Sequence, residues 1–380
     1  MIDPEHFIAT LSEAGIRFVT GVPDSLLKDF GAALTAHYSA DRHVIAANEG
    51  GAVGLAIGHY LAGGSPALVY LQNSGLGNAV NPLVSLADPQ IHGIPIVLLI
   101  GWRGELLDGG AQAHDEPQHR KQGQITPALL EVLSIPYRLI DAATTDVKSL
   151  IEEVVAESRQ RSGPVALLVR RNTFAHAVAG SGSDGDSMSR EEAIRVILSV
   201  IGDDVPIVST TGMASRELFE LRTRDGLGHH REFLTVGGMG HASQIAAGVA
   251  IATPEKKILC LDGDGALLMH MGSLTISAAC DNLLHVVINN GAHDSVGGQP
   301  TKGAVLDLTK IAAACGYGSI AMASNPAEIE SNLQAMLSSN CSSFLEIKCR
   351  RGARPDLGRP DRSPAVNKAE FMSFLSGKTR

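Results

Sequence analysis

The chain has 380 residues, which is enough for two domains or three. Hydrophobic residues make up 44% and charged residues 19%, and this composition excludes a disordered chain. Aromatic residues make up only 4%, and 40 acidic residues outnumber 31 basic ones, which argues against binding of nucleic acid. Residues 1–15 lack a signal-peptide pattern, no apolar stretch is long enough for a membrane span, and the five cysteines include no CxxC pair. We therefore expect a cytoplasmic protein that contacts no membrane.

The first half of the chain alternates short apolar runs with helical patterns. The runs are continuously apolar, as expected for strands that are buried on both faces. The expected strands are 17–20, 44–46, 67–71, 95–100 and 165–169, and the expected helices are 4–14, 25–37, 51–61, 77–87, 126–133 and 145–158. Alternation of this kind predicts a parallel sheet covered by helices on both faces.

A segment rich in Gly, Ser and Asp, residues 175–187, separates this half from a second run of the same kind. A capping-box pattern at 189–192 then opens a helix. The second half is expected to contain strands 206–209, 257–261, 285–288 and 343–348, and helices 215–221, 242–252, 272–279 and 307–315. We therefore predict an α/β protein with domains at 1–178 and 189–380, joined by a linker at 179–188.

Two polar turns follow neighbouring apolar strands of the second half. The first is Gly263–Asp264–Gly265, and the second is Asn289–Asn290–Gly291. Each turn alone would be ordinary, but in a right-handed β-α-β unit both emerge at the same edge of the sheet. Asp264 and Asn290 can then face one small volume, where carboxylate, amide and carbonyl oxygens suit Mg²⁺. The glycines let backbone N–H groups approach a diphosphate.

This pair of turns resembles the signature of thiamine-diphosphate-dependent enzymes, in which GDG is followed at similar spacing by NN. The resemblance implies thiamine diphosphate and Mg²⁺ as cofactors, a pyrimidine-binding first domain and a diphosphate-binding second domain. It makes Asp264, Asn290 and the carbonyl of Ala292 the metal ligands. It places beside the diphosphate Gly263, Gly265, Ala266, Asp294 and Ser295.

Glu49 is the candidate for the carboxylate that activates this cofactor. Thiamine catalysis needs a desolvated carboxylate beside the pyrimidine ring, and Glu49 stands at the start of an almost wholly apolar helix. An N-terminal glutamate also complements a helix dipole, and this is its commoner role. The resemblance favours the catalytic role, because the family's glutamate comes from the first domain.

Residues 236–241 open another apolar helix, with glycines around Met239. By the resemblance, Met239 supports the bent cofactor and the Gly237 carbonyl bonds its pyrimidine amine; a plain core role for Met239 is the alternative. Thr211 ends a strand, and we expect it near the diphosphate. In the family the two domains meet across a subunit interface, which implies a homo-oligomer, at least a dimer with active sites shared between chains.

Five further segments resemble the phosphonopyruvate decarboxylases, with sulfopyruvate decarboxylases as the nearest relatives. These segments are 21–30, 71–83, 101–108, 113–123 and 350–360. The resemblance implies decarboxylation of the 2-oxoacid 3-phosphonopyruvate to phosphonoacetaldehyde and CO₂, and a single fused chain favours it over sulfopyruvate. The alternatives are a sulfopyruvate decarboxylase, a carboligase, and a non-catalytic nucleotide-binding module. The last would carry GxGxxG after the first strand, and residues 21–23 do not begin such a motif.

A substrate with a carboxylate and a phosphonate needs cationic donors, and proton delivery after CO₂ loss needs an acid. The candidates for holding the phosphonate are Arg103, Arg354 and Arg359, with solvated surface arginines as the alternative. The candidates for acid–base work and for lining the same cleft are Asp24, Ser25, His114, Asp115, His119 and His293. Ordinary hydrogen bonding within loops is the alternative for each of them.

Overall fold

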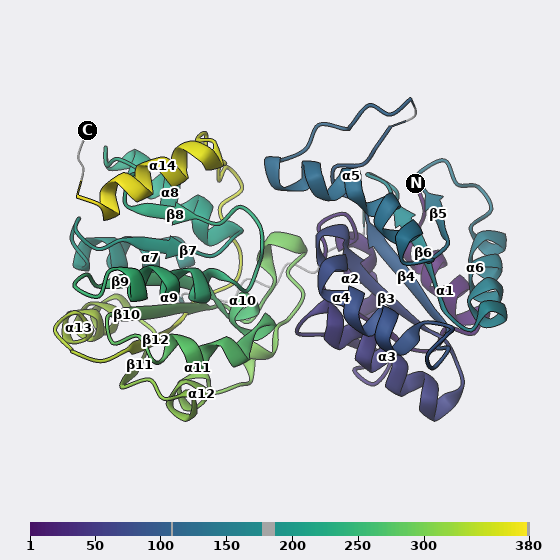
Figure 1. Cartoon of the computed structure of the whole chain (residues 1–380), viewed down its shortest axis with the longest axis horizontal. Coiled ribbons are helices and arrows are strands. Elements are labelled where there is room, and N and C mark those ends of the chain that lie inside the picture. The colour runs from purple at the N-terminus through teal and green to yellow at the C-terminus, as the bar shows by residue number, and fades with distance from the viewer. Residues whose placement is uncertain (108, 177–186, 378–380) are drawn as a thin grey trace. The chain divides into compact units, whose positions relative to one another are not determined.

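The computed structural model describes residues 1–107, 109–176 and 187–377. The chain divides into two compact units, Met1–Gly180 (unit 1) and Ser181–Arg380 (unit 2). Each unit is built on one six-stranded sheet in which all the strands pair in parallel, and helices cover the sheets (Figure 1). This architecture confirms the predicted α/β fold. Of the predicted linker, residues 179–186 lie outside the described residues.

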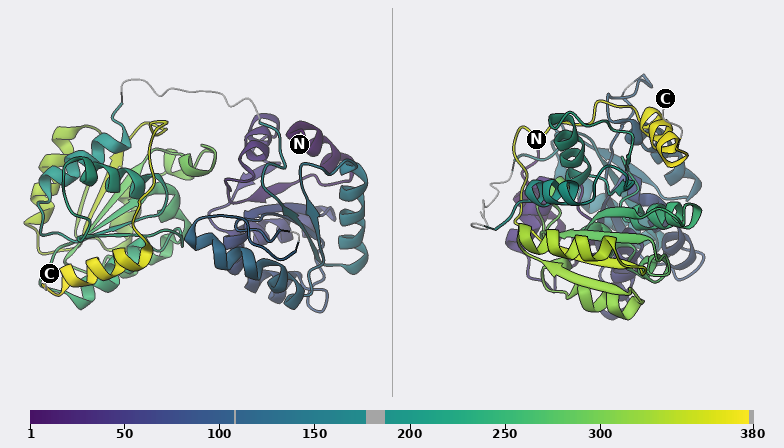
Figure 2. Two further views of the ribbon diagram at one scale, coloured as in Figure 1. Left: turned by 90° about the horizontal axis from the view of Figure 1, so that it is seen from above. Right: turned by 90° about the vertical axis from the view of Figure 1, so that its left-hand side faces the viewer.

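The sheet of unit 1 has the strand order β2-β1-β3-β4-β6-β5. The ribbon views of Figure 2 show helices packed against the sheet of each unit. Its strands are β1 (Val19–Gly21), β2 (His43–Ile45), β3 (Ala67–Gln72), β4 (Ile96–Gly101), β5 (Tyr137–Ile140) and β6 (Pro164–Val169). Its helices are α1 (Pro4–Glu13), α2 (Lys28–His37), α3 (Glu49–Gly63), α4 (Leu76–Pro82), α5 (Pro117–Val132) and α6 (Val147–Arg161). The strand order reverses beside β1, so that the loops after β1, β2, β3 and β4 can converge on a ligand at their carboxyl ends.

Helix α5 begins well before the predicted residue 126, because Pro117 stands in its first turn, where proline is already in a helical conformation. Residues 117–119, which were expected in a loop, are therefore helical.

The sheet of unit 2 has the strand order β11-β12-β10-β9-β7-β8. Its strands are β7 (Ile207–Ser209), β8 (Glu232–Leu234), β9 (Ile258–Gly263), β10 (Leu283–Asn289), β11 (Ser319–Ala323) and β12 (Ser343–Lys348). Its helices are α7 (Arg190–Val200), α8 (Met213–Arg224), α9 (Ala242–Ala252), α10 (Asp264–Met269), α11 (Leu274–Ser277), α12 (Leu308–Cys315), α13 (Pro326–Leu337) and α14 (Pro364–Leu375). Strands β9 and β10 are neighbours in the sheet, which puts the two polar turns side by side.

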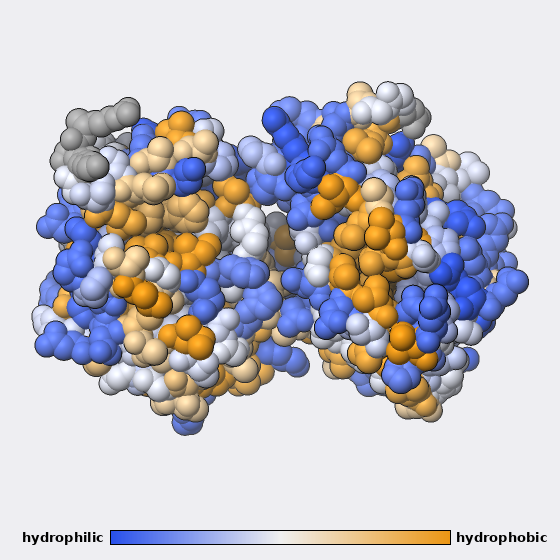
Figure 3. Space-filling model, in the orientation of Figure 1, coloured by the Kyte–Doolittle hydropathy of each residue, from blue (hydrophilic) through white to orange (hydrophobic). Residues whose placement is uncertain are grey.

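The surface of each unit carries exposed aliphatic side chains, and hydrophobic residues gather on the faces seen in Figure 3. Leu55 and Leu61 of α3 are exposed, as are Ile245 and Ile251 of α9. None of the helices in the described part of the chain is long and apolar enough to cross a membrane.

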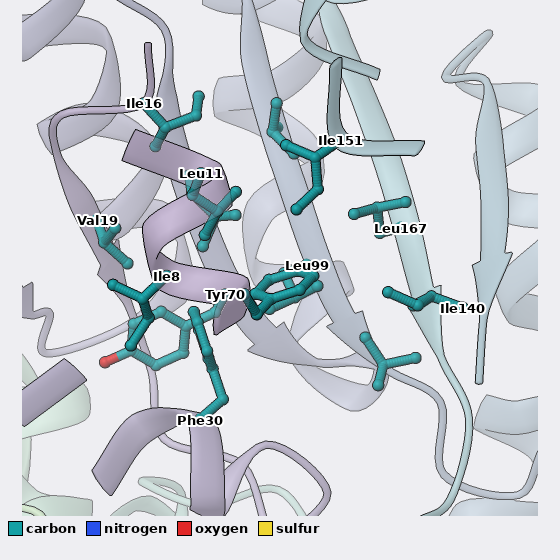
Figure 4. Close-up of a cluster of buried hydrophobic side chains, with 14 of the residues drawn as sticks. Ile8, Leu11, Ile16, Val19, Phe30, Tyr70, Leu99, Ile140, Ile151 and Leu167 are labelled. Carbon is teal, nitrogen blue, oxygen red and sulfur yellow. The ribbon is translucent and has the colours of Figure 1, made fainter. Parts of the chain in front are cut away.

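The core of unit 1 lies on both faces of its sheet, because successive residues of a strand point to opposite sides. Leu68 and Tyr70 of β3 pack on one face against α1, α2 and α6, whereas Val69 and Leu71 pack on the other against α3 and α4. Figure 4 shows the first of these clusters, with Phe30 beside the Tyr70 ring. Two packed faces hold the strands rigidly, so the loops at their carboxyl ends are presented from a fixed frame.

Candidate active site

Asp264 lies at the junction of β9 and α10 and is buried. Burial raises the pKa of its carboxyl to about 6, although the hydrogen bond from the Thr301 hydroxyl and the nearby backbone N–H groups of Gly265 and Asn290 lower it. The Asn290 N–H is thus close enough to act on the Asp264 carboxyl, as expected for turns that follow adjacent strands. All these donors are neutral, so within the described residues the carboxylate has hydrogen bonds but no cationic partner.

The loop after β10 holds the other predicted metal ligands. Asn290 donates from Nδ2 to Asp294 Oδ2 over 2.6 Å, and its Oδ1 accepts the N–H of Ala292 over 3.1 Å. Ala292 is buried and pairs with Pro300 across the base of the loop. The side-chain oxygens of Asp264 and Asn290 and the Ala292 carbonyl therefore come from two adjoining loops.

Asp294 was expected beside the diphosphate, but its Oδ2 is occupied otherwise. It accepts from Arg190 Nη1 over 3.0 Å and from the N–H of Gly352 over 2.9 Å, in addition to Asn290. An anion held by donors from three sides is unsuited to contact another anion, so this geometry argues against the expected place for Asp294.

The remaining residues of this loop line its surroundings. Ser295 is exposed, and it lies beside Gly212, because a Cβ on that glycine would stand 3.4 Å from Ser295 Oγ. Gly212 and Thr211 belong to the loop that follows β7. His293 packs against Gly265, and burial lowers its pKa to about 4, which leaves the imidazole neutral at neutral pH.

The glycines of unit 2 test whether these residues fit a diphosphate and a divalent cation. A Cβ on Gly303 would lie 2.6 Å from Asp264 Oδ2, so only glycine leaves the approach to this carboxylate free. The Thr210 hydroxyl, next to Thr211, is buried and has no hydrogen-bond partner among the residues that the structure describes. A buried carboxylate without a counter-charge, an amide oxygen and a free backbone approach fit a hard cation that carries phosphate oxygens.

Residues 236–241 form an irregular loop between β8 and α9. Gly238 and Gly240 have φ of +66° and +89°, a conformation that favours glycine, and a Cβ on Gly240 would press against His270. Met239 and Gly237 are half-buried, and Met239 belongs to none of the core clusters formed by the described residues. This position leaves Met239 available for a ligand contact.

A buried polar chain beneath Asp264 was missed by the sequence analysis. Asp262 accepts the N–H of Gly263 over 2.9 Å and faces His285 Nε2 at 3.4 Å, and His285 Nδ1 lies 2.8 Å from the Tyr317 hydroxyl. All three side chains are buried. Two features of the sequence indicate such a network: an aspartate, Asp262, directly before the turn at Gly263, and a histidine, His285, within an otherwise apolar strand. These hydrogen-bonded side chains hold in place the backbone that carries Asp264.

In unit 1, Glu49 is the first residue of α3, and Asn48 caps this helix by accepting the N–H of Gly51. Glu49 is only 5% exposed, and burial raises the pKa of its carboxyl although Asn78 Nδ2 donates to it over 2.8 Å. Gly75 lies against the carboxylate, since a Cβ there would stand 2.1 Å from Oε1. A desolvated carboxyl held between two loops can share a proton with a ring nitrogen.

A charged cluster occupies the loops after β1, β4 and β6. Arg103 donates to Asp115 from Nε over 2.9 Å and from Nη2 over 2.6 Å, and from Nη1 to Ser25 over 2.8 Å. Asp115 also pairs with Arg171 at 3.0 Å. Burial raises the pKa of Asp115, but the hydrogen bonds and charge of Arg103 outweigh it and hold the pKa well below its usual range. Asp115, which was expected among the proton donors, is therefore held ionised, and this argues against that role.

Asp24 and the two histidines of this region differ in what they can do. Asp24 is buried against Gly101, its Oδ1 has no hydrogen-bond partner, and burial raises its pKa to about 6. His119 is also buried with an unpartnered Nδ1, and burial lowers its pKa to about 4. His114 is exposed, and its carbonyl accepts from Arg171 over 3.0 Å. Asp24 is thus the group of this cluster best placed to exchange a proton near neutral pH.

The two arginines expected from the C-terminal segment lie in unit 2. Arg354 is bound by three carboxylates, those of Glu191 at 3.0 Å, Glu220 at 2.5 Å and Asp356 at 3.0 Å. Its guanidinium is committed to the scaffold, which argues against the expected contact with a phosphonate. Arg359 lies on the exposed part of the same segment.

Comparison with known proteins identifies both units. Residues 4–126 match the model of the N-terminal thiamine pyrophosphate binding domain of thiamine pyrophosphate enzymes, and residues 210–347 match the model of the C-terminal one. The chain is 34% identical to the phosphonopyruvate decarboxylase of Streptomyces viridochromogenes, over 99% of this chain and 96% of that one. It is 32% identical to that of Streptomyces hygroscopicus, over 99% and 94% of the two chains. It is 29% identical to the sulfopyruvate decarboxylase of Methanosarcina acetivorans, over 83% of each. These matches confirm the resemblance noted in the sequence: the chain belongs to the thiamine-diphosphate-dependent decarboxylases, in the family of the phosphonopyruvate decarboxylases.

Proposed function

We propose that the chain decarboxylates 3-phosphonopyruvate to phosphonoacetaldehyde and CO₂, as a step in the biosynthesis of phosphonate natural products, antibiotics among them. The observation that carries this proposal is the similarity to two phosphonopyruvate decarboxylases along nearly the whole chain. The domain matches support thiamine diphosphate as the cofactor. When bound, this cofactor supplies the electron sink for the C–C bond that breaks.

Unit 2 would hold the charged end of the cofactor. Asp264, Asn290 and the Ala292 carbonyl would bind Mg²⁺, which offsets the unpaired charge of Asp264. The backbone of Gly263, Gly265 and Ala266 and the nearby Thr211 would contact the diphosphate. Met239 and the Gly237 carbonyl would contact the organic rings.

Unit 1 would supply the proton chemistry. Glu49, desolvated and hydrogen-bonded by Asn78, would hold a proton at the pyrimidine ring nitrogen. Asp24 would deliver a proton to the carbon that has lost CO₂, because its pKa near 6 keeps part of the population protonated close to neutral pH.

The charged cluster of unit 1 would bind the substrate's anionic groups. Arg103 and Arg171 share the carboxylate of Asp115, so these three groups carry one positive charge in excess, which Asp24 leaves uncompensated whenever it is protonated. Ser25 lies on the same guanidinium and adds a hydroxyl donor. A phosphonate, which can carry two negative charges, suits such a cluster.

We also propose that the protein is a homo-oligomer, at least a dimer, in which Glu49 of one chain serves the metal site of another. The exposed face of α3 consists of Gly54, Leu55, Gly58 and Leu61, without a charged residue. The exposed face of α9 is similar, with Ile245, Gly248 and Ile251. Small and aliphatic residues in this arrangement allow helices of two chains to pack closely.

The test is the release of CO₂ from phosphonopyruvate, sulfopyruvate and pyruvate, each with and without thiamine diphosphate and Mg²⁺. We expect the highest kcat/KM for phosphonopyruvate, with activity that requires both cofactors. A preference for sulfopyruvate would favour the second candidate function, which the Methanosarcina relative supports. Acetolactate-type products from pyruvate would indicate a carboligase.

Glu49→Gln tests the activating carboxylate within the same assay. The amide keeps the size of the side chain but cannot share the proton, so cofactor binding should persist while turnover falls about 100-fold or more. Turnover near that of the wild type would refute the role of Glu49.

A further inference from the structure

Arg190, the first residue of α7, carries a buried guanidinium that the proposed chemistry does not use. It is 6% exposed, and Glu217 of α8 binds it through two hydrogen bonds, of 2.7 Å from Nε and 2.9 Å from Nη2. Paired in this way, a guanidinium can remain charged inside the protein. The pair leaves Nη1 free to reach a third group.

That third group is Asp294, in the loop that carries the proposed metal ligands. Arg190 Nη1 donates to Asp294 Oδ2 over 3.0 Å, and Nη2 also reaches the Gly352 carbonyl at 3.3 Å. The N–H of Gly352 returns to the same Asp294 oxygen over 2.9 Å. Arg190 and Gly352 thus fix this carboxylate.

The fixed carboxylate determines which way the Asn290 amide faces. Asp294 Oδ2 accepts from Asn290 Nδ2 over 2.6 Å, so Asn290 Oδ1, at the other end of the planar amide, points away from Asp294. There Oδ1 accepts the N–H of Ala292 over 3.1 Å and keeps a second lone pair. If the amide turned by half a rotation, its NH₂ group would face the place of the cation and repel it.

We propose that Arg190 is a positioning residue of the metal site: through Asp294 it holds the Asn290 side chain with its oxygen toward the cation. This inference rests on the Mg²⁺ site of the proposed function. It also gives Asp294 a part other than contact with the diphosphate, since the pairing with Arg190 keeps this carboxylate turned away from a second anion.

The effect of losing Arg190 on the affinity for Mg²⁺ differs according to whether Arg190 only forms a structural ion pair or also positions the Asn290 amide. Loss of Arg190 leaves Glu217 and Asp294 without their cation, and the added negative potential alone would strengthen the binding of Mg²⁺. Loss of the amide orientation would weaken it, and the loss of groups that orient a metal ligand typically weakens metal binding about 10- to 100-fold. The two effects have opposite signs, so the affinity for Mg²⁺ separates them.

The experiment measures the affinity for Mg²⁺ in the presence of saturating thiamine diphosphate, by calorimetry and by displacement of Mn²⁺ followed by electron paramagnetic resonance. We expect Arg190→Met to weaken Mg²⁺ binding about 10-fold or more. Arg190→Lys keeps the charge, but one ammonium group cannot bond Glu217 twice and reach Asp294, so we expect an intermediate loss. The control is Arg222→Met: Arg222 is also buried and pairs with Glu232 at 2.8 Å, and its hydrogen bonds and ion pairs among the described residues go to Asp203, Gly228 and Glu232 and not to the loop at Asn290. This variant should lose stability but bind Mg²⁺ like the wild type.

Binding of Mg²⁺ to Arg190→Met that equals or exceeds that of the wild type would overturn the inference and leave the proposed function intact. If Arg190→Met does not fold, Arg190→Lys decides, and wild-type affinity in that variant overturns the inference. A wild-type protein that binds thiamine diphosphate without any dependence on Mg²⁺ would instead overturn the metal site itself, and this inference with it.

Discussion

Gly75→Ala tests how closely the activating carboxylate must be held. Gly75 ends the short turn Asn73–Gly75 after β3 and has ordinary right-handed backbone angles, φ −80° and ψ −10°, that alanine also adopts. Its new Cβ would stand 2.1 Å from Glu49 Oε1 and 2.5 Å from Cδ. Normal contact between such atoms is roughly 3.4 Å, so the carboxylate must retreat by about 1 Å.

The movement of the carboxylate should slow catalysis more than it destabilises the fold. A displacement of about 1 Å at a reacting group reduces the rate about 100-fold, equivalent to about 2.7 kcal/mol of barrier. Crowding of the buried Glu49 side chain costs about 1–3 kcal/mol of stability, of which the lost freedom of the unfolded chain offsets about 0.4–1 kcal/mol. We therefore expect a folded variant that binds thiamine diphosphate and turns over slowly.

The assay is kcat/KM for CO₂ release, together with calorimetric binding of thiamine diphosphate. Gly77→Ala is the matched control, because no atom lies within 4 Å of its Cβ position and it belongs to the adjoining helix α4. Gly75→Ala within about threefold of Gly77→Ala would show that the position of the Glu49 carboxylate does not limit the reaction.

Two further predictions concern the metal ligand and the sharing of sites. Asp264→Asn should abolish Mg²⁺-dependent binding of thiamine diphosphate, yet stabilise the cofactor-free protein by up to about 3 kcal/mol at pH 7.5, because burial raises the pKa of Asp264 from 3.8 to about 6. In the wild type, the raised pKa makes the ionised Asp264 destabilising above pH 6, whereas below pH 4 the carboxyl is protonated in both the folded and the unfolded state. The stability advantage of Asp264→Asn should therefore shrink as the pH falls toward 4. A wild type that melts at a higher temperature than Asp264→Asn at pH 7.5 would contradict this prediction. Mixing inactive Glu49→Gln and Asp264→Asn chains should restore about a quarter of wild-type activity, because half of the random dimers would contain one intact shared site. No recovery, despite chain exchange seen by native mass spectrometry, would place both residues of a site in one chain.

The inner strands of both sheets could be predicted from the sequence, whereas several outer ones could not. Strands β3, β4, β6, β9, β10 and β12 are buried over most of their length and largely apolar, because helices cover both of their faces. Strands β5 and β11 stand at the edges of their sheets and are mostly half-exposed, and β8 is a three-residue edge strand that begins with a glutamate. At such edges, polar residues break the apolar run on which the prediction depends.

The meeting of Asp264 with Asn290 could be foreseen for a related reason. In a parallel sheet, loops after adjacent strands emerge at one edge, and pairing of β9 with β10 brings these two loops together. Side-chain partners do not follow from any such rule. Arg190 and Asp294 are 104 positions apart, and Arg354 and Glu191 are 163 apart, so no local pattern indicates that they meet.

The number of carboxylates around an arginine distinguishes arginines that hold the fold together from arginines that are available to bind an anionic substrate. Three carboxylates surround Arg354, which leaves an excess of negative charge and repels an anionic substrate. Around Asp115 the arginines outnumber the paired carboxylate, since Arg103 and Arg171 share Asp115, and one positive charge is left over when Asp24 is protonated. In the sequence Arg103 and Arg354 are equal candidates, because each lies in a segment that contains glycine and other loop-forming residues. Only the assembled cluster sets the local potential, and on this ground we expect the anionic groups of the substrate at Arg103 and not at Arg354.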